Sequence, residues 1–306
     1  MRIFIAGATG VIGRRVVPRL VAIGHHVSAV GRTPEKCAAL ERMGAVAAQV
    51  DLFDGDRVRQ AVIGHDVVIN LTTSIPTSSR IFFRGAWREN DRIRRIVSSN
   101  LATASQAVGV RRFIQESFAP VYPDRGDEWI GEHTPLQPVS YNQSLLDAED
   151  AVTRFRAGGG TGVVLRFAFF YGADSAFTRD AFQYIRRGWA PVLGPTTAFM
   201  SSLSHDDAAT AVVAALSAES GVYNVADNEP VRRREYVGSL TSTLGIAPPK
   251  FPPAFLARLI GPLGKLLSRS IRVSNRKLRA ATGWKPMYPS VREGWRVIAE
   301  ELGYLR

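Results

Sequence analysis

Three glycines near the start of the chain are spaced in a way that could support cofactor chemistry. The segment "GATGVIG" places Gly7, Gly10 and Gly13 directly after an apolar stretch of strand length. The first glycine permits a tight turn, the second lets a phosphate approach the backbone, and the third lets the following helix pack close to the strand. The phosphates would then lie at the partly positive N-terminus of that helix. This spacing predicts a dinucleotide-binding site.

The residues after the second and third expected strands indicate which dinucleotide binds. An acidic residue at the end of the second strand would hydrogen-bond a ribose 2′-hydroxyl and favour NAD. The chain instead has "VGRTPEK", in which Arg32 offers a planar cationic fork suited to a 2′-phosphate. We therefore expect NADP, with NAD less favoured. Asp51, after the third strand, is expected to accept a hydrogen bond from the adenine amino group. The full set of expected cofactor contacts is Gly7, Thr9, Gly10, Val11, Ile12, Gly13, Arg32, Asp51, Leu52, Leu71 and Thr72.

Alternating strands and helices are expected to position these residues. The apolar runs of strand length are residues 2–7, 26–30, 45–52, 66–72, 111–117 and 162–172. Helical patterns occupy residues 11–24, 34–44, about 87–108 and about 139–157. Strands buried on both faces and separated by helices predict an α/β fold with a doubly wound parallel Rossmann sheet.

The chain is expected to divide into a core and a smaller lobe. Residues 1–172 would form the dinucleotide-binding core. Residues 173–306 would form mainly a substrate-binding lobe over the carboxyl ends of the strands, with some elements returning to the core. The apolar segment 253–270 carries Arg258, Lys265 and Arg269, and could lie on a membrane or dock a carrier protein. An amphipathic helix that covers the lobe is the favoured interpretation.

Composition limits the classes of partner. The chain has 306 residues and a net charge of +12, but 34 of its 39 basic residues are arginine and no element alternates basic with aromatic residues. We therefore expect no nucleic-acid partner, although the positive field could attract an anionic substrate. No apolar run is long enough to span a bilayer. A single cysteine, Cys37, excludes an intrachain disulfide and fits a cytoplasmic location.

Taken together, several segments resemble the extended short-chain dehydrogenase/reductase family, which includes NAD(P)-dependent epimerases and dehydratases. They are "GATGVIG", "NLATASQAVGVRRFI" (100–114), "EHTPLQPVSYNQSLLDAE" (132–149), "LRFAFFYG" (165–172), "SLSHDDAATAV" (202–212) and "GWKPMYPSVREGW" (283–295). The resemblance covers nearly the whole chain. It implies that Tyr141 is the active-site tyrosine and that the helices around 87–108 and 139–157 could form a homodimer interface.

The active-site segment departs from the family pattern at two positions. The family has a lysine four residues after the tyrosine, where this chain has Leu145. It also has a serine or threonine four residues before the tyrosine that corresponds to Tyr122, where this chain has Phe118. The hydroxyl that orients the substrate is therefore either missing or supplied by the neighbouring Ser117. Tyr141 and Ser117 are the predicted catalytic residues.

These losses favour one direction of chemistry. Without the cation of the lysine, Tyr141 should stay protonated at neutral pH and be a poor base. A neutral phenol can still donate a proton to a developing oxyanion, which favours reduction of a carbonyl group. The substrate is expected to be a small or medium organic molecule, anionic or apolar. Two alternatives stay open: a non-catalytic NADP-binding sensor or regulator, and a non-redox isomerase, lyase or cyclase that uses the same pocket.

Other polar residues have stronger structural than catalytic interpretations. Tyr122, Tyr171 and His205 could reach the same cleft by resemblance, but Tyr171 ends an apolar strand and His205 stands at a helix start, where a capping role is expected. Arg166, inside an apolar strand, should be paired and structural. No histidines or cysteines have metal-ligand spacing, so we predict no metal.

Overall fold

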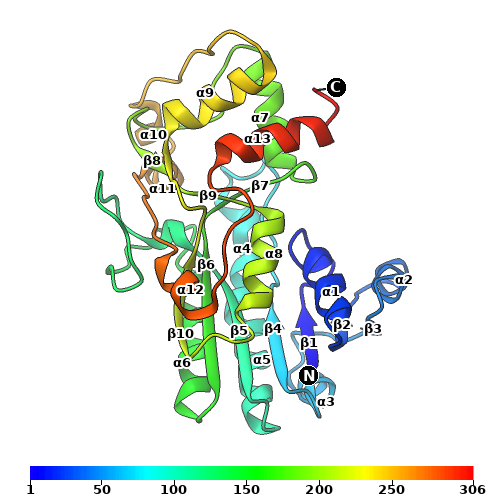
Figure 1. The fold of residues 1–306 in the computed structure, drawn as a ribbon. Helices are drawn as coiled ribbons and strands as arrows, with labels where there is room; N and C mark the ends of the chain where they lie inside the picture. Colours follow the sequence, from blue (N-terminus) through cyan, green and yellow to red (C-terminus); the bar gives the residue numbers. More distant parts are fainter. Residues whose placement is uncertain (306) are drawn as a thin grey trace.

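A parallel sheet of seven strands forms the centre of the structure (Figure 1), a computed structural model that describes residues 1–305. Its strands are β1 (Arg2–Ala6), β2 (His26–Val30), β3 (Val46–Ala48), β4 (Val67–Asn70), β5 (Arg112–Phe118), β6 (Thr161–Phe167) and β10 (Gly221–Val225). Their order is β10-β6-β5-β4-β1-β2-β3, so the winding direction reverses between β1 and β4. Open parallel sheets bind ligands at such a reversal. The predicted doubly wound α/β fold is confirmed.

Alternate residues of the strands face two separate layers of helices. In β1, Ile3 and Ile5 pack into the core that holds α1 (Gly13–Ala22) and α8 (His205–Ala214). Phe4 and Ala6 pack into the core that holds α3 (Gly55–Val62), α5 (Ser98–Ala107) and α6 (Ser144–Ala157). Most strand positions are therefore apolar, which explains the apolar runs. The buried polar residues of the strands, such as Asn70 and Ser117, are hydrogen-bonded. Helix α2 (Pro34–Arg42) packs beside α1 through Leu40.

The helical stretch before α5 is irregular. It consists of a 3₁₀ turn η1 (Arg84–Trp87), helix α4 (Arg88–Arg92) and a π-helical turn η2 (Ile93–Val97) that leads into α5. A single helix was predicted over about 87–108, but π turns insert an extra residue that periodicity does not reveal. Within η2, Arg94 is buried and pairs with Glu116 on β5, with 3.5 Å between Nε and Oε1.

Two predicted elements have different boundaries in the structure. Helix α6 begins at Ser144, whereas the sequence pattern placed its start near residue 139. Tyr141 therefore lies in the turn before the helix. The strand predicted over 162–172 divides into β6 and β7 (Phe169–Tyr171), because β7 leaves the main sheet and pairs with β9 (Ser202–Ser204).

Five helices gather beyond the carboxyl ends of the strands and form the smaller lobe (Figure 1). They are α7 (Ala176–Arg186), α9 (Arg233–Leu244), α10 (Leu256–Leu259), α11 (Pro262–Ser268) and α13 (Val291–Glu301). Helices α7, α9 and α13 share a core that contains Phe182, Tyr236 and Trp295, whereas Leu263 of α11 packs with Tyr141 and Trp87. Helix α12 (Arg276–Thr282) packs against β10, and β8 (Phe199–Met200) pairs with β11 (Val231–Arg232).

The segment 253–270 is not one amphipathic helix. It forms the short helices α10 and α11, because Gly261 between them adopts φ of 67°, a left-handed conformation that interrupts a helix. Within residues 1–305, no helix is both long enough and apolar enough to cross a membrane.

Candidate active site

The glycine turn has the steric features of a phosphate cradle. Gly7 adopts φ of 82°, and a Cβ there would lie 2.5 Å from the carbonyl carbon of Leu71. A Cβ at Gly13 would overlap the carbonyl oxygen of Gly7. Side chains are therefore excluded at both positions, and helix α1 starts directly against β1 and β4. Within residues 1–305, the amides of Val11 and Ile12 have no hydrogen-bond acceptor, so these donors can bind an anion. The turn fits a dinucleotide pyrophosphate.

The end of β4 lies beside this turn, as the predicted contact set requires. Asn70 is fully buried and its Oδ1 accepts bonds from the amide and the hydroxyl of Thr72, at 3.1 and 2.5 Å. Its Nδ2 donates to Gln115 Oε1 at 2.9 Å and to Ser98 Oγ at 3.2 Å. The position of Thr72 is therefore fixed by a buried amide. The structure brings Leu71 and Thr72 together with Gly7.

The residues expected at the adenosine end follow neighbouring strands. Arg32 is exposed in the turn between β2 and α2, where Thr33 caps the helix. Asp51 is exposed after β3, and its carboxylate accepts a bond from the amide of Phe53 at 2.9 Å. Because β2 and β3 are parallel neighbours, both residues lie at the same edge of the sheet.

Tyr141 is held in its turn by aromatic and polar contacts. Its side chain is buried, its ring packs edge-to-face on Trp87 with centroids 5.7 Å apart, and Arg84 lies 5.8 Å from the ring centroid. The hydroxyl donates a hydrogen bond to the carbonyl of Phe82 at 3.0 Å. A substrate oxygen would have to replace the Phe82 carbonyl as acceptor of this hydrogen bond.

The residues that follow Tyr141 anchor the turn. Leu145 is fully buried. Ser144 donates to the buried Asp91 at 2.7 Å, and Asp91 also pairs with Arg84 at 2.8 Å. The serine of the family motif thus fastens α6 to α4, while an apolar side chain fills the space of the family lysine. No sequence pattern singled out Asp91 or Arg84, because Arg84 precedes the helix that was predicted from about residue 87.

Ser117 belongs to a buried polar network beneath the carboxyl end of β5. It is fully buried and donates to Glu149 Oε1 at 2.6 Å. Arg166 binds both oxygens of the same carboxylate, at 2.8 and 2.5 Å, which confirms the expected pairing of Arg166. To contact a substrate, Ser117 would have to give up its bond to Glu149. Phe118, its neighbour, packs edge-to-face on Phe169 with centroids 5.4 Å apart.

The other candidate acids and bases are enclosed. Tyr122 is fully buried, accepts a bond from Arg166 and donates to Asn224, and burial raises its pKa to about 12. Burial also raises the pKa of Tyr171 well above its usual value. Both phenols stay protonated at neutral pH. Within residues 1–305, no group of three or more His, Cys, Asp or Glu side chains could hold a metal ion.

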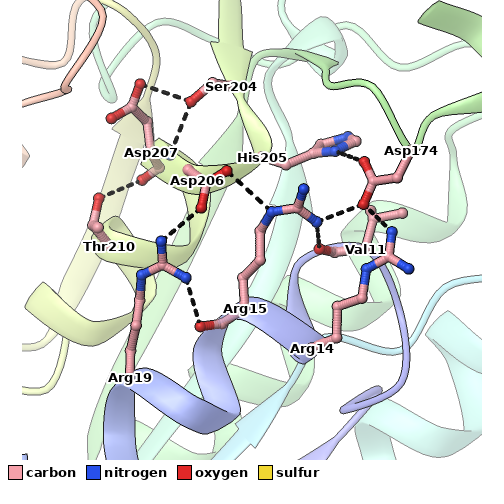
Figure 2. A network of polar contacts seen from close by, with 10 residues as sticks. All are labelled: Val11, Arg14, Arg15, Arg19, Asp174, Ser204, His205, Asp206, Asp207 and Thr210. Carbon is pink, nitrogen blue, oxygen red and sulfur yellow. Dashed lines mark hydrogen bonds and ion pairs between the residues drawn. The ribbon is translucent and has the colours of Figure 1, made fainter. Parts of the chain in front are cut away.

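An ion-pair network joins the glycine turn to the smaller lobe (Figure 2). Arg14 and Arg15, directly after Gly13, both pair with Asp174 in the β7–α7 turn, the latter at 2.6 Å. Arg15 and Arg19 pair with Asp206 on α8, at 3.2 and 2.6 Å.

His205 belongs to the same network but not as a helix cap. It is the first residue of α8, while Ser204 is the cap, and its Nδ1 lies 2.7 Å from Asp174 Oδ1. Burial and the charges of Arg15 and Arg14 lower its pKa to about 4, so it is neutral at pH 7. The sequence revealed none of these partners, because Asp174 and Asp206 are about 160 and 190 residues from the arginines.

The comparisons with known proteins agree with this geometry. Residues 7–219 match the family described as NAD(P)H-binding. A 3-diazoavenalumate denitrifying reductase from Streptomyces sp is 32% identical, over 96% of this chain and 99% of its own. A 4-hydroxy-2-methyl-3-oxo-4-farnesyl-3,4-dihydroquinoline-1-oxide ketoreductase from Stigmatella aurantiaca is 28% identical, over 89% of this chain and 82% of its own.

Solved structures share the fold over the full length. A Thermus thermophilus UDP-glucose 4-epimerase in complex with NAD superposes with a TM-score of 0.79 at 21% identity, over 99% of both chains. A human epimerase family protein with NADPH gives a TM-score of 0.80 at 20% identity, over 99% of this chain and 100% of its own. These structures show the fold that the chain shares with epimerases bound to NAD or NADPH. The family match and the relatives named as reductases identify a short-chain dehydrogenase/reductase-like oxidoreductase, and the chain belongs to the NAD(P)H-binding family.

Proposed function

We propose that this oxidoreductase uses NADPH to reduce a carbonyl group of a small or medium organic substrate, with Tyr141 as the proton donor. The observation that carries the proposal is the environment of the Tyr141 hydroxyl. Its hydroxyl donates to the Phe82 carbonyl, and Leu145 offers no positive charge that would favour a phenolate. Protonated tyrosine suits the reductive direction, in which a proton is delivered to oxygen. The Streptomyces and Stigmatella relatives are named as reductases, which supports the same direction.

The chain's own residues would bind the cofactor, orient the substrate and protonate its oxygen. A bound NADPH supplies the hydride. The amides of the glycine turn would hold the pyrophosphate, and Thr72, fixed by Asn70, would line the path to the nicotinamide. The hydroxyl of Tyr141 would exchange its bond with Phe82 for one with the substrate oxygen and transfer its proton as negative charge develops there. Ser117 stays a predicted catalytic residue. Its hydrogen bond to Glu149 supports a structural role instead.

NADPH is proposed because of Arg32. It is exposed at the end of β2, where no acidic side chain competes for the ribose. A guanidinium suits a 2′-phosphate. Solved neighbours hold either cofactor, so the fold leaves the choice to this position.

Cofactor choice is tested by fluorescence titration of the purified protein with NADPH and NADH. We expect NADPH to bind at least about ten-fold more tightly, and Arg32→Asp to remove the difference. Arg42→Asp, at an exposed position on α2, is the control with the same change of charge. Equal affinity of the wild type for both cofactors would contradict the role of Arg32.

The reaction is tested by following NADPH consumption and product formation over a panel of carbonyl compounds. We expect Tyr141→Phe to lower kcat by about 10²–10⁴-fold without loss of NADPH affinity. The control Tyr184→Phe, at an exposed position of α7, should leave kcat unchanged. Full activity of Tyr141→Phe would refute the proton-donor role. Cofactor binding without turnover would favour the sensor alternative, and product without a change in NADPH would favour the non-redox one.

Two coarser expectations complete the proposal. We propose a cytoplasmic location, which a fusion to a fluorescent protein would test.

We also propose a homodimer through the faces of α4–α5 and α6, where Ile96 is 39% exposed. Light scattering after gel filtration gives the mass in solution, and a mass near 33.5 kDa would refute the dimer.

A further inference from the structure

A cavity of about 700 Å³ opens between the Tyr141 turn and the short helices α10 and α11. Cavities of this volume accommodate medium-sized organic molecules. Its walls come from two parts of the chain that are more than 100 residues apart in sequence. The lining residues are Val139, Ser140, Ala257, Arg258, Gly261, Pro262, Lys265 and Ser268.

The cavity shares a wall with the proposed proton donor. Ser140 lines it and is bonded through the peptide to Tyr141. Leu263, on α11, is buried in one apolar cluster with Tyr141 and Trp87, and Val139 packs against that cluster. Helix α11 therefore covers the tyrosine with one side and lines the cavity with another. A molecule bound in the cavity would therefore contact Ser140, the residue that precedes the tyrosine.

The cavity wall carries two cations and no acid. Arg258 and Lys265 are exposed, and within residues 1–305 neither side chain forms an ion pair or a hydrogen bond. Nearby arginines differ in this respect. Arg233 donates to the carbonyls of Leu267 and Arg269, and Arg269 donates to the carbonyls of Pro120 and Tyr122. Those two hold α11 in place, whereas the cavity cations have unused donors.

We propose that this cavity binds the substrate through a carboxylate group, with Arg258 and Lys265 as its specificity-determining residues. An arginine fork and a lysine ammonium together neutralise one carboxylate and supply directed donors. The apolar side chains of Val139, Ala257 and Pro262 would contact the body of the substrate. The proposal rests on the reductase function above and adds a substrate class: oxo acids, or other reducible molecules that carry a carboxylate.

Pairs of an oxo acid and its methyl ester show whether binding depends on the charge of the ligand or on its shape. The substrate test compares 4-oxo-4-phenylbutanoate and further oxo acids with their neutral methyl esters, under NADPH. We expect Arg258→Gln and Lys265→Gln each to raise KM for the acids by about five- to twenty-fold, with a smaller change in kcat. KM for the esters should not change. Arg279→Gln, at an exposed position of α12 outside the cavity, removes the same charge and should leave both values unchanged.

A binding measurement tests the subsite without turnover. Titration of the NADP⁺ complex, which cannot reduce the ketone, with 4-oxo-4-phenylbutanoate is followed by tryptophan fluorescence. Binding is expected to saturate in the wild type and to weaken at least ten-fold in the double variant Arg258→Gln/Lys265→Gln. Arg258→Lys should restore part of the affinity lost in Arg258→Gln.

The outcomes distinguish the two proposals. Binding that depends on both cations, without reduction of any ligand, would support the subsite and refute the reductase function. Reduction of acids and esters with equal KM, unchanged in the variants, would refute the subsite and support the reductase. Competition by inorganic phosphate at lower concentration than by benzoate would refute the carboxylate as the ligand group, and failure of the wild type to bind any acid of the panel would refute the subsite.

Discussion

The hydroxyl of Ser117 donates a hydrogen bond to Glu149, and Arg166 binds both oxygens of the same carboxylate. All three side chains are buried, so each depends on the others for its hydrogen bonds. The network fastens β5, β6 and α6 to one another.

Ser117→Ala should therefore act on stability more than on chemistry. The substitution removes one donor to a carboxylate that keeps its bidentate partner, so we expect the free energy of unfolding to fall by about 1–2 kcal/mol. Urea unfolding followed by circular dichroism measures this change, and NADPH oxidation measures kcat. A kcat loss above about 100-fold with unchanged stability would show that Ser117 orients the substrate after all.

Leu145→Lys restores the lysine of the family pattern at a site packed for an apolar residue. The side chain is fully buried, so the new ammonium would be desolvated. We expect a loss of about 2–4 kcal/mol in unfolding free energy and no gain in alcohol oxidation. Leu145→Met keeps the apolar volume and should cost less than about 1.5 kcal/mol. A stable lysine variant with increased oxidation would instead mean that the site still accommodates the family's catalytic pair.

At the scale of elements, the network of Figure 2 connects three segments at the glycine turn: α1, the β7–α7 turn and the start of α8. Gly172 lets this contact form, because a Cβ there would overlap the ring of His205. Asp174 shares its carboxylate among Arg14, Arg15 and His205. The lobe is thereby fixed over the helix whose N-terminus would hold the cofactor.

This network should make stability depend on pH through His205. The folded pKa, about 4, lies below the unfolded value near 6.5, so the unfolded chain binds more protons between these values. The contribution is fully present above about pH 6.5 and is lost as the pH falls to about 4. Its size is at most about 3 kcal/mol. In urea unfolding across this window, His205→Asn should lose less stability on acidification than the wild type, and parallel curves would contradict the buried neutral histidine.

At the scale of the whole molecule, the chain carries a net charge of +12. A positive field raises the association rate of anionic ligands, and salt screens it. NADPH carries one phosphate more than NADH. We expect the apparent affinity for NADPH to fall more steeply between about 0.02 and 0.3 M salt than that for NADH. Stopped-flow fluorescence gives the association rates, and equal salt slopes would show that the net charge does not assist cofactor capture.

Local patterns alone predicted the parallel sheet and the glycine turn. Both depend on short-range requirements: a strand between two helical layers must be mostly apolar, and the backbone at Gly7 and Gly13 has no room for a side chain. The pairing of Arg166 was predictable for a similar reason, since a charge inside an apolar strand needs a partner. The position of Leu145 in the motif also showed, without a structure, that a cation was missing.

Tertiary structure decided what the polar residues do. Ser117 and Glu149 are 32 residues apart, and Arg14 and Asp174 are 160 apart, so no spacing rule links them. The cavity of Arg258 and Lys265 exists because Gly261 breaks one expected helix into two, which then fold over the Tyr141 turn. Hydrogen bonds and cavities form between surfaces that meet only after the chain has folded. Steric and apolar preferences act on each residue and its neighbours, and are therefore visible in the sequence itself.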